Sequence, residues 1–295
     1  MKKSILFLMI TFLVACQNDS NTNEMTSTDE PVVTDTSSSN PAAEKVSSNA
    51  LEGMYVGYFQ SKKTNDEENA SYSNKINIVI EKIENKNISG HTVVAGNLRP
   101  FSGTINSENY AEVSEPGDDK YDGEFMFTCY PALEEITGTW IANDSKLAVS
   151  ERFFTLKKTT FSYNEDLLIA EITGDENDDY PYAHLTENQN DIGLEVEAIT
   201  WDAIRINASN KILKKEDIEN LYKGDLEIIR NTVYARHGYS FKNRKMRYFF
   251  DSYVDWYVPV SIDVRSALTE IEKKNDELLK RYEEHAESYY DYFGR

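Results

Sequence analysis

The spacing of hydrophobic and polar residues divides the chain into a strand-like part and a helix-like part. From residue 51 to 160, apolar and polar residues alternate in short runs. In one run, Ile76, Ile78 and Ile80 share a face, and alternation with a period of two is typical of strands with one buried face. Strands are predicted at 55–59, 75–82, 88–94, 98–105, 124–130, 138–141 and 152–156.

Turn residues separate these strands, and no helical pattern lies between them. Asn, Gly, Asp and Pro gather in the intervening segments, for example at Glu115–Asp118, and such clusters favour turns. Consecutive strands joined by turns form an antiparallel meander, and closing a meander removes its exposed edges. We therefore predict an antiparallel, barrel-like domain over residues 51–160.

The interior of this barrel has two interpretations. An open interior would accept a small apolar ligand, whereas the Ile, Phe and Tyr side chains of the strands would fill a closed one, which we favour. Cys129 shares a strand face with Phe125 and Phe127. A lone cysteine among aromatic residues is usually a small core residue, so we do not expect a catalytic thiol.

A connecting region, residues 161–208, is predicted to be rich in β-structure. Apolar runs at 167–170 and 193–199 flank the acidic segment Asp175–Asp179. This segment has the alternating oxygen ligands with which a calcium loop begins, but Tyr180 replaces the glycine at its sixth position and Thr186 the glutamate at its twelfth. We interpret it as a solvated loop and expect no metal site.

Helical periodicity extends from about residue 209 to 295, which makes the fold class α+β with a small all-α C-terminal domain. Asp225 is suited to cap a helix that ends at His237, because Gly238 is a natural residue for the position after a helix. Asn275 interrupts an apolar stripe and should find a partner, since an unpaired buried amide costs ~1–3 kcal/mol. Further helices are predicted at 216–221, at 244–253 and in the segment carrying Leu268, Ile271, Leu278 and Tyr282.

The helix ending at His237 has apolar residues on two sides. Leu226, Ile229 and Val233 form one stripe at a spacing of about 100° per residue, whereas Ile228 and Ala235 lie opposite. A helix that is apolar on two sides is usually buried. We therefore predict that it is the central helix of its domain.

The N-terminus has the features of a secretory signal. Lys2 and Lys3 precede an apolar run that is too short to span a bilayer and ends in Leu13-Val14-Ala15-Cys16. These four residues resemble a bacterial lipobox, and an ordinary signal peptide with a chance cysteine is the alternative. The resemblance implies a signal peptide at 1–15, cleavage before Cys16, a diacylglyceryl group on its thiol, and in some such proteins a third acyl chain, such as palmitate, on its new amine. Acyl chains anchor a protein without a spanning helix.

The segment from 16 to 50 consists largely of Ser, Thr, Asn, Asp and Glu. It has too few large apolar residues to offset the entropy of ordering, so we expect a flexible linker that holds the folded part away from the membrane. Gln17 stands where an Asp would resemble the inner-membrane retention signal of enterobacteria. We expect an extracytoplasmic protein of the cell envelope, in the outer membrane if the host is Gram-negative.

Charge and cysteine content exclude several classes of protein. The chain has 31 basic and 51 acidic residues and a formal charge of −20, which argues against a nucleic-acid partner because phosphates attract basic surfaces. Its two cysteines cannot form a disulfide framework or a multi-cysteine metal site. No P-loop, dinucleotide fingerprint or paired-histidine spacing is present, so we expect no cofactor.

The last third of the chain carries a family resemblance. Arg230-Asn231 is followed by Tyr234-Ala235-Arg236-His237-Gly238, and then by Phe241, Tyr248-Phe249 and Trp256–Pro259. Together with Leu213 and Glu216–Ile218 upstream, this pattern resembles the YARHG domain, whose signature pentapeptide stands here without a substitution. The resemblance implies an extracytoplasmic domain of bacterial envelope proteins, often lipid-anchored, with no established reaction.

The signature has a binding and a structural interpretation. Arg236 and His237 would join a basic island in an acidic protein and receive a carboxylate or phosphate of a wall polymer or partner protein. Alternatively, cations at a helix C-terminus complement the helix dipole and pair with nearby acids, and we favour this structural interpretation. The island would consist of Arg230, Arg236, His237, Lys242, Arg244, Lys245 and Arg247.

Two classes of function remain. We favour a non-catalytic envelope protein that is held at a membrane by its lipid and has a binding or structural role. Its candidate partners are a cell-wall polymer, an envelope protein and a small apolar ligand. The alternative is a hydrolase that uses His237 or His91 with a carboxylate. The histidines are isolated in the sequence, so no spacing favours catalysis.

Overall fold

The computed structural model describes residues 48–169, 185 and 199–289. The signal peptide, Cys16 and the linker as far as residue 47 lie outside the described residues. The short helix α1 (Ser48–Leu51) occupies the end of the predicted linker, so residues 48–50 are helical where the sequence predicted a flexible linker. No helix among the described residues is long and apolar enough to cross a membrane.

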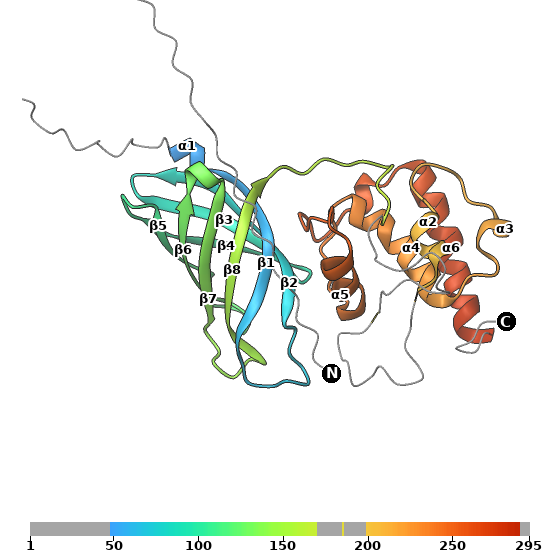
Figure 1. The fold of residues 1–295 in the computed structure, drawn as a ribbon, viewed down its shortest axis with the longest axis horizontal. Coiled ribbons are helices and arrows are strands. Elements are labelled where there is room, and N and C mark those ends of the chain that lie inside the picture. Colours follow the sequence, from blue (N-terminus) through green and yellow to red (C-terminus); the bar gives the residue numbers. More distant parts are fainter. Residues whose placement is uncertain (1–47, 170–184, 186–198, 290–295) are drawn as a thin grey trace, which may run out of the picture. The chain divides into compact units, whose positions relative to one another are not determined.

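Strands in the first half of the described chain form a closed antiparallel barrel (Figure 1). Each strand pairs with its neighbour in sequence, and β1 pairs with β8, which confirms the predicted meander and its closure. The sequence pattern missed one short strand, β5. The strands are β1 (Gly53–Thr64), β2 (Ser73–Glu84), β3 (Asn87–Val94), β4 (Asn97–Ile105), β5 (Tyr110–Ser114), β6 (Gly123–Tyr130), β7 (Glu135–Ala142) and β8 (Val149–Thr159).

The barrel core consists of the alternate residues that the sequence pattern assigned to one face. Phe59 is central to an aromatic group, with its ring centroid 6.0 Å from that of Phe125 and 5.6 Å from that of Trp140. Cys129 is buried on the same face as Phe125 and Phe127, and burial raises the pKa of its thiol to about 12. The thiol therefore stays protonated, as a core residue should.

The outer face of β2 is also buried, although a strand with period two predicts a solvated face there. Lys75 donates from Nζ to the backbone oxygens of Val254 at 2.6 Å and Tyr257 at 3.1 Å. Asn77 donates from Nδ2 to the oxygen of Pro259 at 3.0 Å. Carbonyl oxygens of a distant segment thus accept the hydrogens of both side chains, which offsets part of the cost of burial. The side-chain oxygen of Asn77 is buried without a hydrogen-bond partner among the described residues.

Helices form the second half, as predicted for the C-terminal domain. The predicted β-rich character of 161–208 is wrong where that region is described: residues 161–169 form no strand, and α2 is a helix capped by Thr200. The acidic segment 175–179 and residues 193–198 lie outside the described residues. The helices are α2 (Trp201–Arg205), α3 (Lys215–Ile218), α4 (Lys223–Arg236), α5 (Arg244–Tyr253) and α6 (Glu270–Tyr289).

Helix α4 is buried on two sides, as its sequence predicts. Leu226 packs in one cluster with Leu279 of α6, and Ile228 packs in a second cluster with Phe249 and Phe250 of α5. Separate apolar clusters on opposite faces place α4 at the centre of the helical domain.

The predicted cap of α4 is wrong. Asp225 lies inside the first turn of the helix, and Tyr222 is the N-cap residue. The carboxylate of Asp225 instead accepts hydrogen bonds from the backbone nitrogen (2.7 Å) and the hydroxyl (2.9 Å) of Thr200. Burial raises the pKa of Asp225 to about 6. Asp225 therefore joins α4 to the start of α2.

The inward face of α6 is more polar than its apolar stripe predicts. Glu272, Asn275, Leu279 and Glu283 are buried, whereas Leu278 is only half-buried. Asn275 is fully satisfied, because it accepts from a backbone nitrogen and donates to two backbone oxygens. This confirms that the interrupting amide finds partners and shows that α6 turns acidic residues toward the core.

Candidate functional site: the signature helix and its cleft

Arg236 of the signature is buried inside the domain. Its Nε and Nη2 donate to the carbonyl oxygen of Leu167 at 2.9 and 2.6 Å, and its Nη1 donates to the hydroxyl of Ser209 at 3.0 Å. Only 2% of the residue is exposed, and burial lowers the pKa of its guanidinium to about 10. These bonds occupy the carbonyl of Leu167, which a strand at 167–170 would have paired, and residues 167–169 form no strand.

His237 forms a compact group with two residues from other segments. Its Nε2 lies 2.8 Å from Oε2 of Glu272, while the ring of Tyr163 stacks on it with centroids 4.3 Å apart. The hydroxyl of Tyr163 donates to Oε1 of Glu272 at 3.1 Å. Both carboxylate oxygens of Glu272 are thus held by aromatic side chains that lie on top of one another.

The pKa of Glu272 shows how well this carboxylate is satisfied. Burial alone would raise the pKa, but hydrogen bonds from His237, Ser209 and the backbone of Thr269 lower it to about 2. At the start of α6, the backbone nitrogen of Thr269 donates to the carboxylate of Glu272, and the backbone nitrogen of Glu272 donates to the hydroxyl of Thr269. This reciprocal arrangement satisfies free backbone groups at a helix N-terminus. Glu272 therefore joins the signature to the first turn of α6.

The other signature residues have structural contacts as well. The hydroxyl of Tyr234 donates to Oδ1 of Asp276 at 2.9 Å, and Ala235 is 1% exposed. Gly238 ends α4 with a φ of +73°, and a Cβ there would lie 2.2 Å from Cγ2 of Val260. Left-handed backbone and close contact both require glycine at this position. This confirms the predicted helix end.

Arg230, one turn before the pentapeptide, pairs with Glu283 of α6. The contact is bidentate: Nε donates to Oε1, and Nη2 donates to Oε2 at 3.0 Å. Asp276 lies 3.9 Å from Nη1. Arg230 thus binds an acid from α6 rather than one of the acids close to it in the sequence. Asn231 donates to the carbonyl oxygen of Glu227 at 2.8 Å.

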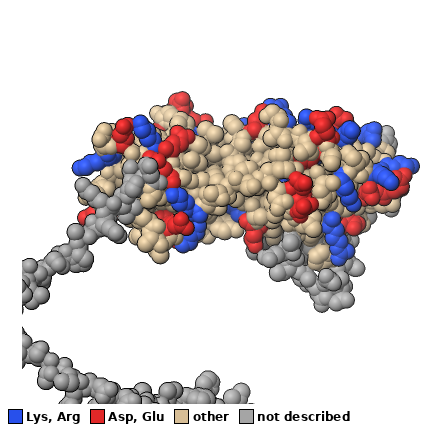
Figure 2. All heavy atoms as spheres, turned by 90° about the horizontal axis from the view of Figure 1, so that it is seen from above, with Lys and Arg blue, Asp and Glu red and all other residues tan. Residues whose placement is uncertain are grey.

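The basic island inferred from the sequence is not a single exposed surface. Arg236 and His237 are buried, Arg244 donates to the oxygen of Ala70 at 2.6 Å, and Lys245 lies 2.6 Å from Oε2 of Glu227. On the face drawn in Figure 2, basic and acidic side chains are interspersed. Neighbouring cations in the sequence are therefore directed to separate acids and carbonyls.

One part of the island borders a cleft between α4 and the first turn of α5. The cleft has a volume of about 260 Å³. Lys242 is exposed at this cleft and has no ion pair among the residues that the structure describes. The lining residues are Glu227, Arg230, Asn231, Tyr239, Phe241, Lys242, Asn243, Lys245 and Met246.

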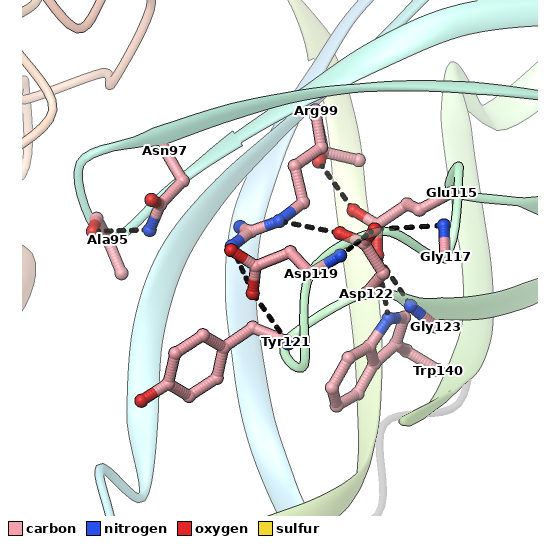
Figure 3. A network of polar contacts seen from close by, with 11 residues as sticks. Ala95, Asn97, Arg99, Glu115, Gly117, Asp119, Tyr121, Asp122, Gly123 and Trp140 are labelled. Atoms are coloured by element: carbon pink, nitrogen blue, oxygen red, sulfur yellow. Dashed lines mark hydrogen bonds and ion pairs between the residues drawn. The ribbon is translucent and has the colours of Figure 1, made fainter. Parts of the chain in front are cut away.

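A second polar network lies in the barrel and was not identified from the sequence (Figure 3). Glu115 accepts hydrogen bonds from the backbone of Gly123 at 2.8 Å and from the indole of Trp140 at 3.4 Å. Arg99 donates from Nε to Asp122 at 3.0 Å. Burial raises the pKa of Glu115 to about 7, despite opposing hydrogen bonds and the charge of Arg99. Only its turn-forming residues, Glu115–Asp118, were visible in the sequence.

Two of the histidines, His91 and His237, each pair with one carboxylate in the described part of the chain. His91 lies with Nδ1 2.7 Å from Oε1 of Glu81 on the barrel, and His237 pairs with Glu272. Neither ring is hydrogen-bonded to a hydroxyl or thiol among the described residues. His285 is on α6, and His184 lies outside the described residues. Within the same limits, no group of three or more acidic, histidine or cysteine side chains has the geometry for a metal.

Fold and site together define a protein with a closed β-barrel followed by a helical domain organised around its signature. Residues 202–284 match the YARHG domain family, so the helical part of the chain is a YARHG domain. The barrel precedes the matched residues. Comparisons with curated proteins and with solved structures gave no match.

Proposed function

We propose that this protein is a lipid-anchored, extracytoplasmic protein of the bacterial cell envelope with a non-catalytic binding role. A YARHG domain beside a β-barrel fits an extracytoplasmic binding or structural role. The lipobox-like sequence before Cys16 supports the anchor, and the polar segment that follows would give the folded part reach from the membrane. Gln17 after the cysteine favours the outer membrane in a Gram-negative host.

One observation carries the non-catalytic part of the proposal: the polar groups of the pentapeptide are already bound within the chain. A general acid or base must reach a substrate proton, but the side chain of His237 is 6% exposed and lies between Tyr163 and Glu272. Arg236 is equally enclosed. The signature thus stabilises the domain, which leaves ligand contact to other residues.

The partner we favour is a polymer or protein of the envelope that binds at the cleft. A small apolar ligand is the less favoured partner, because aromatic and aliphatic side chains occupy the inside of the barrel. The acidic surface and the paired cations give no support for a nucleic-acid partner.

The anchor is tested by metabolic labelling with a fatty-acid analogue in cells that express Cys16→Ser. We expect the label to disappear from this variant. Cys129→Ser is the matched control, since it removes the other cysteine and should keep the label. Labelling of Cys16→Ser at the wild-type level would contradict the proposal. Protease treatment of intact cells then tells which side of the outer membrane the protein faces.

The enzyme alternative is tested on ester and cell-wall substrates with the purified protein. Both His237 and His91 have a carboxylate partner, so each is a possible base for a hydrolase. We expect no turnover by wild type. Turnover that is lost in His237→Gln or His91→Gln, with folding retained, would replace the binding proposal by the hydrolase.

A further inference from the structure

The cleft beside α4 holds one available cation in an acidic protein. Its lining includes three cations and one carboxylate, in a chain with a formal charge of −20. Arg230 is bound by Glu283, and Lys245 is bound by Glu227. Lys242 is exposed and unpaired within the described residues. An anion that enters the cleft would therefore meet a single ammonium group without displacing an existing partner.

Neutral hydrogen-bonding groups lie around this cation. The hydroxyl of Tyr239 has no hydrogen-bond partner in the described part of the chain. Asn243 uses its side-chain oxygen to cap α5 at the backbone nitrogen of Met246, which leaves its amide nitrogen available. Asn231 uses its amide nitrogen on Glu227, which leaves its side-chain oxygen available. The cleft thus offers donors and an acceptor beside one positive charge.

The size and floor of the cleft limit its occupant. Phe241 and Met246 are 2% and 5% exposed and provide an apolar floor. The volume of about 260 Å³ is below the usual range for drug-sized ligands, which is roughly 300–1,000 Å³. The ligand that fits such a cleft is small and has one negative charge, several hydroxyl groups and an apolar ring face. Sugar acids have this combination.

We propose that the cleft binds one acidic sugar unit, a hexuronate, of an envelope polysaccharide. Lys242 would face the carboxylate, while Tyr239, Asn231 and Asn243 would bond the sugar hydroxyls. The proposal rests on the proposed envelope location and names the ligand class for it. A run of acidic peptide side chains fits less well, because the cleft has a single unpaired cation and a carboxylate of its own, Glu227.

Isothermal titration of the full-length protein in detergent with trigalacturonate tests this site. We expect saturable binding that weakens with salt. Lys242→Gln should weaken it about tenfold or more, and Tyr239→Phe about threefold, as expected for lost charged and neutral hydrogen bonds. Lys280→Gln is the matched control, because Lys280 is an exposed lysine on α6 outside the cleft lining, and it should bind like wild type.

Neutral maltotriose, inorganic phosphate and hexaglutamate complete the test. Weak or absent binding of all three supports a site for an acidic sugar. The proposal is overturned by absent trigalacturonate binding, by equal binding of Lys242→Gln, or by competition from phosphate or hexaglutamate at similar concentrations. Equal affinity for neutral maltotriose would also overturn it, because the carboxylate of the sugar would then contribute nothing to binding. Any of these results leaves Cys16 labelling unchanged, so failure of this site is distinguishable from failure of the proposed lipid anchor.

Discussion

The ring of Tyr163 lies on the ring of His237, with 4.3 Å between centroids and 18° between planes. Tyr163 belongs to the segment that follows the barrel, whereas His237 ends α4, and Glu272 of α6 binds both. The signature histidine therefore packs against one residue, Tyr163, that precedes the segment matching the YARHG family, 202–284, whereas Glu272 lies within that segment. This relationship predicts where the folding unit of the helical domain begins.

A fragment that covers residues 161–295 should be more stable than one that covers 206–295. The shorter fragment lacks Tyr163 and Leu167, the partners of His237 and Arg236, and leaves buried polar groups unpaired at ~1–3 kcal/mol each. Thermal unfolding followed by circular dichroism should show a cooperative transition for the longer fragment, with a higher melting temperature than that of the shorter one. Equal melting temperatures would show that the segment after the barrel contributes nothing.

Arg230→Ala should destabilise the helical domain by about 2–4 kcal/mol, because it leaves the largely buried Glu283 without its partner. Denaturant unfolding measures this change. Arg265→Ala is the matched control: Arg265 also makes a bidentate pair, with Asp263, but both side chains are exposed. The control should unfold like wild type. If Arg230→Ala unfolded at the same denaturant concentration as wild type, a structural role for Arg230 would be contradicted.

Glu272 should make the helical domain sensitive to acid. Its pKa of about 2 lies below the ordinary value of 4.5, so the folded state favours the carboxylate. The resulting stability is present above pH 4.5 and is lost as the pH falls toward 2, by about 1–3 kcal/mol. Unfolding free energies at pH 5 and pH 3 should differ less in Glu272→Gln than in wild type. An identical pH dependence would show that the carboxylate is not selectively stabilised.

Glu115 should give the barrel the opposite pH dependence. Its pKa of about 7 lies above the ordinary value of 4.5, so the folded state favours the protonated acid. That stabilisation is present below pH 4.5 and is lost as the pH rises through 7. Glu115→Gln should therefore be more stable than wild type at pH 8, by about 1–3 kcal/mol, with a smaller difference at pH 5. A variant less stable than wild type at pH 8 would show that the fold needs the charged form.

Local patterns were enough to predict much of the architecture. The period-two faces of β2 and β6 predicted barrel residues such as Ile76 and Phe127, because a barrel buries alternate residues. Gly238 marked the end of α4 because the backbone there is left-handed. The bounds of α5 agree with the predicted helix at 244–253.

Interactions between distant segments were not predictable in the same way. Glu272 and Glu283 resemble solvated residues of an exposed helix, and only the fold brings them to His237 and Arg230. The apolar run at 167–170 has the composition of a strand, and a short run of this kind fits several structures. The structure shows no strand at 167–169, where Arg236, 69 residues along the chain from Leu167, donates to the carbonyl oxygen of Leu167.

The central claim is that the signature residues hold the domain together, and the unfolding free energy of Arg236→Lys tests it most directly. A lysine keeps the charge but cannot reproduce the planar set of bonds to Leu167 and Ser209. We predict a loss of about 1–3 kcal/mol relative to wild type, while the exposed Arg265→Lys unfolds like wild type. An Arg236→Lys protein that unfolds at the same denaturant concentration as Arg265→Lys would contradict the claim.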